Sequence, residues 1–359
     1  MSHLKLFTRL GQTATALLAA LLLLGGLMPD FRPDDSPPPE GPLRLRSGLP
    51  FKHSDEVLTE RFVRSLRDHG GLLCLGTSET TTLAGGNWPD FLNADTARAA
   101  VLAGAGRTPG VHLPWLEAVK GELAGLGLVY YLNPVYWNAH LGQTDPAYFL
   151  RYTTPHQLRL AARHHPALAE AFAALPLTDR FHPGPWLRAL RRPWFQDFRW
   201  RFLSRSSFDE AFAPLTTYAG TPPQGPSPDI DLEKGMLRTF AHADWFSPAL
   251  PPGEAAFRDA ELLDFIAACE GWGVELTVVL GPPNLPFIRH HFPDAAPASQ
   301  TLQAHLRALL SSTGVHWVDA TDIGEIPGAF HDHQHISSFG AFLIAERLRE
   351  TLNLPPLDR

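Results

Sequence analysis

Residues 71–79, Gly71-Leu72-Leu73-Cys74-Leu75-Gly76-Thr77-Ser78-Glu79, combine a predicted strand with a candidate reactive serine. Its first half is a short apolar run between glycines, which is typical of a fully buried strand. Its second half places a serine directly after that strand. Ligands of an open α/β sheet bind beyond the carboxyl ends of the strands, so Ser78 is expected where a nucleophile is useful. A Gly-Thr-Ser turn is also an ordinary helix N-cap, and this alternative stays open.

Further short runs predict the rest of a sheet, at residues 126–132, 274–280 and 315–318, with a weaker one at 99–103. Helical patterns lie between them, including 113–123 and 261–268. Strands that alternate with helices predict an α/β fold in which helices cover both faces of a parallel sheet.

The composition excludes several classes of protein. The chain has 359 residues, of which 44% are hydrophobic, so it has ample material for a core and is unlike a disordered chain. A formal net charge of −7 excludes a strongly basic surface as its main feature, and no nucleic-acid partner is expected. Two cysteines, Cys74 and Cys269, exclude a disulfide scaffold and a cysteine-based zinc cluster, and both are expected to be free.

The amino terminus predicts a membrane anchor. Residues 10–28 are mostly apolar and long enough to cross a bilayer as a helix. Lys5 and Arg9 precede this run and acidic residues follow it, which places the amino terminus in the cytoplasm and the remainder outside. A cleavable signal peptide is the alternative, but no clear small-residue cleavage pattern follows the run. We therefore expect a single-pass protein of the cell membrane with an extracytoplasmic domain.

This interpretation divides the chain into three parts: an anchor at 1–29, a proline-rich tether at 30–50 and one domain at 51–359. Within the domain, residues of about 140–253 interrupt the alternation of strands and helices. They are first helix-like and aromatic, then rich in proline and glycine, and we interpret them as an insertion between the third and fourth strands. Its aromatic residues predict a small satellite core, with a substrate- or membrane-facing surface as the alternative.

A histidine-rich loop near the carboxyl end supplies a candidate base for Ser78. Residues 330–340 read Phe-His-Asp-His-Gln-His-Ile-Ser-Ser-Phe-Gly, and an amphipathic helix follows. Asp332 and His335 are three residues apart, so the carboxylate can accept a hydrogen bond from one imidazole nitrogen. The other nitrogen is then available to take a proton from a serine. These three residues are a candidate catalytic triad, with a helix cap and an unrelated polar loop as the alternative.

Other residues are candidates for supporting roles. The backbone N–H groups of Ser78 and Gly106 and the side chain of Asn133 are candidate donors to an oxyanion. Glu79 and Trp137 are candidate substrate contacts. For Glu79 the sequence favours a structural role at the start of a helix, and for Trp137 core packing is the alternative.

Taken in order, these blocks resemble the SGNH (GDSL-like) hydrolases. The pattern has a Gly-x-Ser after the first strand, a glycine in the second block, an asparagine in the third and a late Asp-x-x-His. More narrowly, residues 76–79, 282–284 and 332–340 resemble the blocks of the DltD family, although Thr77 stands where that family has a serine. The resemblance implies a three-layer α/β/α, flavodoxin-like domain behind one transmembrane helix.

The resemblance also implies an activity. It is that of a serine esterase or acyltransferase acting on D-alanyl or similar small acyl esters of a cell-envelope polymer such as a teichoic acid. No metal or organic cofactor is implied, and a membrane-bound O-acyltransferase is the implied partner. Two other functions stay open: a non-catalytic envelope scaffold that binds the acylated polymer or its acyltransferase, and a metal-dependent hydrolase that uses His331, His333 and His335.

Overall fold

The computed structural model describes residues 60–68, 70–80, 87–92, 99–104, 106–138, 149, 155–174 and 252–357. The expected anchor, the tether and the larger part of the insertion lie outside these residues. Among the described residues, no helix is both long enough and apolar enough to cross a membrane.

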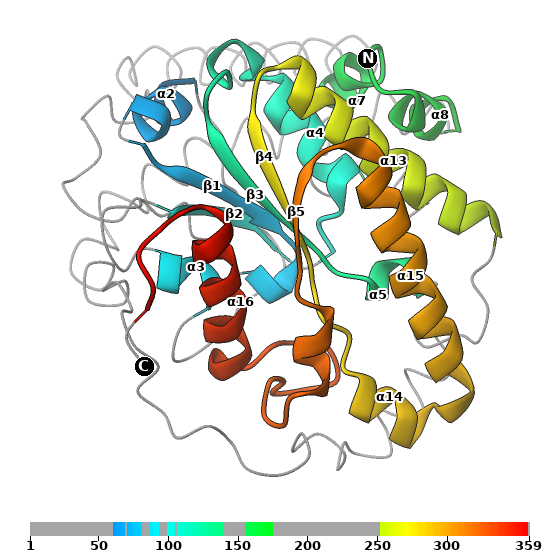
Figure 1. Ribbon diagram of the computed structural model, residues 1–359. Coiled ribbons are helices and arrows are strands. Elements are labelled where there is room, and N and C mark those ends of the chain that lie inside the picture. Colours follow the sequence, from blue (N-terminus) through cyan, green and yellow to red (C-terminus); the bar gives the residue numbers. More distant parts are fainter. Residues whose placement is uncertain are drawn as a thin grey trace, which may run out of the picture.

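Five parallel strands form one sheet in the order β2-β1-β3-β4-β5 (Figure 1). The strands are β1 (Leu72–Gly76), β2 (Ala99–Ala103), β3 (Gly127–Leu132), β4 (Glu275–Leu280) and β5 (His316–Asp319). All five predicted strands are confirmed to within one residue at each end. The second strand, β2, lies at one edge of the sheet beside β1. The next strands, β3, β4 and β5, follow one another on the other side of β1. This reversal between β1 and β3 opens a crevice beyond their carboxyl ends.

Side chains that alternate along the strands build two cores, one on each face of the sheet. Leu73 and Leu75 of β1 belong to one cluster, whereas Cys74 between them belongs to the other. This period of two is what a strand buried on both faces requires. The predicted α/β fold with a parallel sheet between helices is therefore confirmed. Cys74 and Cys269 are both free and buried, as expected.

The helices divide between these two faces. The larger core packs against α2 (Glu60–Asp68), α4 (Pro109–Glu117), α5 (Val135–Asn138), α7 (Pro155–Ala161), α8 (Pro166–Ala174), α13 (Pro252–Gly271), α14 (Leu285–His291) and α15 (Ala296–Thr313). The smaller core packs against α3 (Trp88–Leu92) and α16 (Ser338–Thr351), which lie side by side in front of the sheet in Figure 1. Short 3₁₀ turns complete the connections: η1 (Ser78–Thr80), η2 (Lys120–Glu122), η4 (Pro293–Ala295) and η5 (Thr321–Glu325).

The helix predicted over 113–123 is wrong in its bounds. The structure has α4 four residues earlier, at Pro109–Glu117, and then the separate turn η2. Pro109 occupies the first turn, where a missing N–H removes no helical hydrogen bond, and Thr108 before it is extended. The helix predicted over 261–268 is confirmed as the middle of the longer α13.

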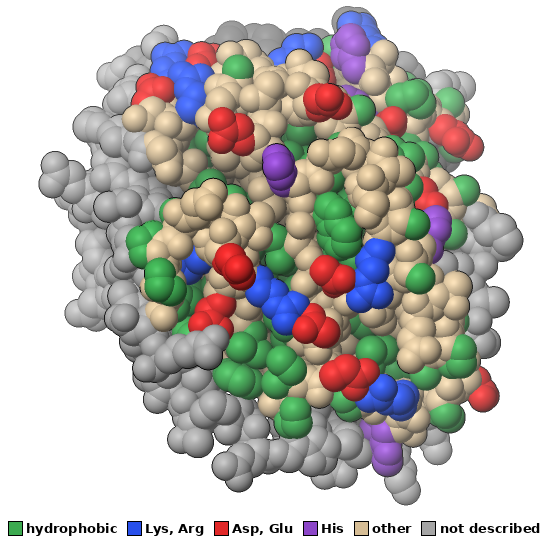
Figure 2. All heavy atoms as spheres, in the orientation of Figure 1, with side chains coloured by type: hydrophobic (Ala, Val, Ile, Leu, Met, Phe, Trp, Pro, Cys, Tyr) green, Lys and Arg blue, Asp and Glu red, His purple; other side chains and the backbone are tan. Residues whose placement is uncertain are grey.

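Charges on the visible surface are balanced. In Figure 2, acidic and basic side chains are interspersed over α15 and α16 instead of being gathered by sign. Part of this pattern consists of ion pairs near α14, α15 and α16, which are Arg289–Glu325, Arg307–Asp319 and Arg347–Asp322. Exposed pairs of this kind stabilise a fold by about 0–1 kcal/mol each, so their main effect is to neutralise this face locally.

Candidate active site

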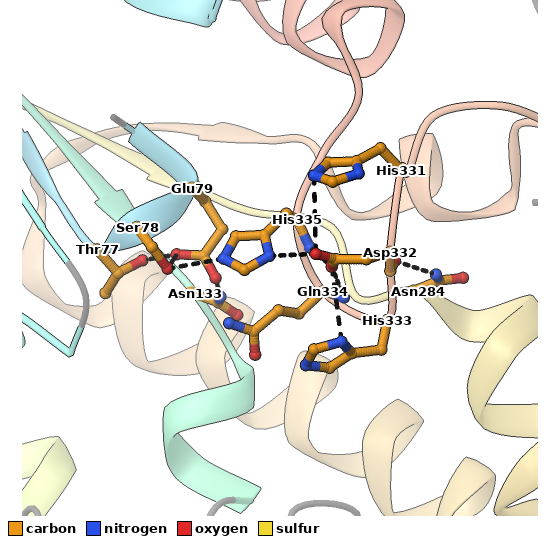
Figure 3. Close-up of polar contacts among 10 residues, drawn as sticks. All are labelled: Thr77, Ser78, Glu79, Asn133, Asn284, His331, Asp332, His333, Gln334 and His335. Atoms are coloured by element: carbon orange, nitrogen blue, oxygen red, sulfur yellow. Dashed lines mark hydrogen bonds and ion pairs between the residues drawn. The ribbon is translucent and has the colours of Figure 1, made fainter. Parts of the chain in front are cut away.

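The side chains of Ser78, His335 and Asp332 meet at the carboxyl edge of the sheet (Figure 3). The Oγ atom of Ser78 is 3.0 Å from Nε2 of His335. On the other side of the same ring, Nδ1 is 2.5 Å from Oδ2 of Asp332. Ser78 begins η1 directly after β1, and the other two residues lie in the loop before α16. The predicted meeting of these three side chains is therefore confirmed.

The loop 329–337, which carries the acid and the base, is closed on itself. The backbone N–H of Ser337 donates to the carbonyl of Ala329 at 2.8 Å, and Phe330 and Ile336 form an antiparallel bridge. The Ser337 hydroxyl also caps α16, because it accepts a hydrogen bond from the backbone N–H of Gly340. Because one residue both closes the loop and starts the helix, α16 fixes the position of the loop.

Asp332 is held by hydrogen bonds of its own. Its Oδ1 accepts from the backbone N–H groups of Gln334 and His335, at 2.9 Å and 2.6 Å. Its carbonyl accepts from Nδ2 of Asn284 at 3.0 Å, and Asn284 in turn caps α14. Asn284 belongs to the Pro-x-Asn block, for which the sequence indicates no role. The structure gives it one, which is to attach the loop 329–337 to the segment that follows β4.

The charges of the site favour the protonation states that a triad needs. Burial would lower the pKa of His335, but the hydrogen bond to Asp332 and the negative charges of Glu79 and Asp332 outweigh it, so the pKa is raised above 6.5. Burial would raise the pKa of Asp332, but the hydrogen bonds from His335 and Gln334 hold it well below its usual range. An ionised Asp332 keeps a proton on Nδ1 of His335 and leaves Nε2 as the acceptor for the serine.

Glu79 follows Ser78 in the chain, and its side chain is fully buried. Its Oε2 accepts from the hydroxyl of Thr77 and is 3.3 Å from Oγ of Ser78, and its Oε1 accepts from Nδ2 of Asn133 at 2.6 Å. Its backbone carbonyl accepts from Nδ2 of Asn87 at 2.6 Å. The sequence favours a structural role for Glu79, and these contacts agree with it. The donors to its carboxylate are, however, the side chains of Thr77 and Ser78 beside it and of Asn133 after β3.

The candidate oxyanion donors lie at the same edge of the sheet. Asn133 follows β3. Its Oδ1 accepts a hydrogen bond from the backbone N–H of Val135 at 2.9 Å, and one N–H of its Nδ2 donates to Glu79. The amide therefore has a second N–H for another acceptor. Gly106 lies in the connection from β2 to α4 with a φ of 71°, a conformation that glycine adopts readily.

The structure places Trp137 in the larger core. Its side chain is 3% exposed, and its indole N–H donates to Asp259 of α13 at 2.9 Å. These contacts match the core-packing alternative, and a substrate contact at this residue stays a prediction.

A small pocket opens beside the triad. It is lined by Asn133 and Val135 beyond β3, by Asn284 and the two prolines before it, and by His333 and Gln334 of the loop. Oε1 of Gln334 is buried and has no hydrogen-bond partner among the described residues. Burial, partly offset by Asp332, lowers the pKa of His333 to about 4, so its ring is neutral at neutral pH. Gln334 is a candidate substrate contact that no sequence motif indicates.

One group of side chains has the composition of a metal site. Ligand atoms of His331, Asp332 and His335 all lie within 4.8 Å of one another. His333, which the sequence suggests as a third histidine of such a site, is not part of this group. Asp332 and His335 also belong to the candidate triad. The same two side chains are therefore candidates both for metal binding and for acid–base chemistry with Ser78.

Comparison with known protein families and with characterised proteins finds no match for this chain.

Proposed function

We propose that the chain is a serine esterase or acyltransferase in which Ser78 is the nucleophile, His335 the general base and Asp332 the residue that orients the base. The observation that carries this proposal is the unbroken line of contacts from Oγ of Ser78 through both ring nitrogens of His335 to Asp332. Triads are recognised by this geometry and not by the order of their residues in the chain.

The reaction follows from these contacts. As Oγ of Ser78 attacks an ester carbonyl, Nε2 of His335 takes its proton, and the charge of Asp332 stabilises the imidazolium. The ring then returns the proton to the leaving alcohol. The acyl group on Ser78 passes to water or to an acceptor hydroxyl that His335 deprotonates in the same way. The backbone N–H groups of Ser78 and Gly106 and the second N–H of Asn133 stabilise the oxyanion.

The position of Ser78 in the sheet supports this assignment. The strand order β2-β1-β3-β4-β5 matches that of flavodoxin-like domains, whose ligands bind at the reversal between β1 and β3. Ser78 follows β1 and Asn133 follows β3, so the nucleophile and one oxyanion donor flank this reversal. An SGNH hydrolase of the DltD type is the family that we propose.

The substrate belongs to the same proposal. The acyl group that we propose is D-alanyl or a similar small group, as the resemblance of residues 76–79, 282–284 and 332–340 to the DltD blocks implies. The apolar run at residues 10–28 supports an anchor that holds the domain on the extracytoplasmic side of the membrane. There we propose an ester of a cell-envelope polymer as the substrate and a membrane-bound O-acyltransferase as the partner.

The test compares two serine variants of the full chain with p-nitrophenyl acetate as the probe. Ser78→Ala should lower kcat by at least about 10³-fold, because it removes the nucleophile, with an unchanged circular dichroism spectrum. Ser312→Ala on the exposed side of α15 is the matched control, and its turnover should equal that of the wild type. Full turnover by Ser78→Ala would refute the proposal.

A further inference from the structure

The geometry of His331 relative to the triad suggests a second use of this site. Nε2 of His331 is 3.7 Å from Oδ2 of Asp332, the same oxygen that Nδ1 of His335 contacts. The rings of His331 and His335 are nearly parallel, with their centroids 6.1 Å apart. In Figure 3 the two rings approach Asp332 from different directions, and one nitrogen of each ring points toward its carboxylate.

This donor set suits zinc better than the other common divalent cations. Two imidazole nitrogens and one carboxylate oxygen are a known zinc combination, with a water as the fourth ligand. Ligands about 2.1 Å from a tetrahedral ion lie about 3.4 Å apart. The His331–Asp332 separation is close to this value, and the His335–Asp332 contact has to open by about 1 Å. Magnesium and calcium prefer oxygen ligands and fit the set poorly.

Solvent has access to the proposed ligands. The side chain of His331 is 49% exposed, and those of Asp332 and His335 are 23% and 21% exposed. Both cysteines, the strongest competitors for zinc, are buried, and burial raises the pKa of the Cys269 thiol to about 12.

We propose that Nε2 of His331, Oδ2 of Asp332 and Nδ1 of His335 bind one Zn²⁺ ion, and that this ion inhibits the enzyme reversibly. The inhibition rests on the proposed function, whereas the binding does not. In the active state the neutral ring of His335 has its proton on Nδ1. A zinc ion on Nδ1 displaces that proton to Nε2, which then donates a hydrogen bond and accepts none. Ser78 thereby loses its base, and the metal also removes the contact between Asp332 and the ring.

Zinc binding to the full chain is measured first, by competition with a chromophoric chelator, and needs no turnover. The wild type should bind one Zn²⁺, and His331→Ala should raise the Kd by at least about tenfold, because it removes one of three ligands. His290→Ala is the matched control, since His290 is an exposed histidine on α14 outside the group. Absence of binding, or equal affinity of wild type and His331→Ala, would overturn the site.

Hydrolysis of p-nitrophenyl acetate is measured next, with and without zinc. At ten times the Kd, zinc should lower wild-type and His290→Ala activity about tenfold, and a chelator should restore it. His331→Ala should keep its metal-free activity at that zinc concentration, and magnesium should have no effect. Zinc that binds without inhibiting would overturn the regulatory half of the proposal. Turnover that requires zinc and survives Ser78→Ala would replace both proposals by a metal-dependent hydrolase.

Discussion

The hydroxyl of Ser78 and the imidazole of His335 are 257 positions apart in the chain and 3.0 Å apart in space. Parallel strands produce this meeting, because the loops after β1 and after β5 open at the same edge of the sheet. The loop 329–337 then reaches back from β5, at the edge of the sheet, toward β1. Its attachment to Asn284 and to the start of α16 keeps the imidazole facing the serine.

Asp332→Asn tests the role of the acid. The amide cannot supply the negative charge that fixes the proton on Nδ1 of His335, so kcat/KM for an ester should fall by about 10³- to 10⁴-fold. Asp322→Asn is the control, because Asp322 is an exposed carboxylate paired with Arg347 and should lose less than about twofold. Ester hydrolysis by the two purified variants gives the comparison. A loss below tenfold in Asp332→Asn would mean that His335 does not depend on this carboxylate.

The pH dependence of kcat/KM tests the state of His335. The ring must be neutral to accept a proton, and its pKa is raised above 6.5, so activity should rise with pH along a limb centred above 6.5. The negative charge of Glu79 contributes to this raised pKa. Glu79→Gln should therefore move the limb to lower pH. Identical limbs in wild type and Glu79→Gln would show that Glu79 does not act on His335.

Asn133→Ala tests the proposed oxyanion donor. Loss of its second N–H should lower kcat by about 10²- to 10³-fold with little change in KM. The variant also leaves the buried carboxylate of Glu79 without one donor, so the free energy of unfolding should fall by about 1–3 kcal/mol.

Thr77→Val separates these two effects. It removes another donor to Glu79, but Thr77 is not a candidate oxyanion donor. We expect a similar loss of stability in urea titration and a kcat within about threefold of the wild type. If both variants lost the same activity, the effect of Asn133→Ala would be structural.

Gly340→Ala tests how α16 positions the loop 329–337. A Cβ atom at this position would lie 2.2 Å from the carbonyl oxygen of Ala329, which is backbone and cannot rotate away. The variant should lose about 1–3 kcal/mol of stability and part of its turnover, because the loop 329–337 has to shift. Gly271→Ala at the end of α13 is the control, since nothing lies within 4 Å of its Cβ position. Equal stability of the two variants would contradict the packing described.

The strands were the easiest part of the fold to predict from sequence. Each is a short apolar run, and its length and the residues that flank it favour a strand over a helix. The helix α15 was not predicted, although Leu302, Leu306 and Leu310 lie four residues apart and face the core. The start of α4 was missed because Thr108 and Pro109 precede the apolar residues on which the predicted helix was centred.

Within the candidate site, contacts inside one loop could be predicted from sequence, whereas contacts between distant segments could not. The spacing of Asp332 and His335 lies within one loop, so their contact could be predicted. The surroundings of Glu79 could not, because one of its side-chain donors, Asn133, is 54 residues away and follows another strand. The contact of Asn284 with the carbonyl of Asp332 also forms only when β4 and the loop are placed together in space.

A covalent adduct on Ser78 would test the proposed nucleophile most directly. The full chain is incubated with a fluorophosphonate and digested, and its peptides are examined by mass spectrometry. We predict one adduct, on the peptide that contains Ser78, which is absent in Ser78→Ala and forms more slowly in Asp332→Asn. A folded protein that gains no adduct, or that gains it on a different serine, would contradict the assignment of Ser78 as the nucleophile.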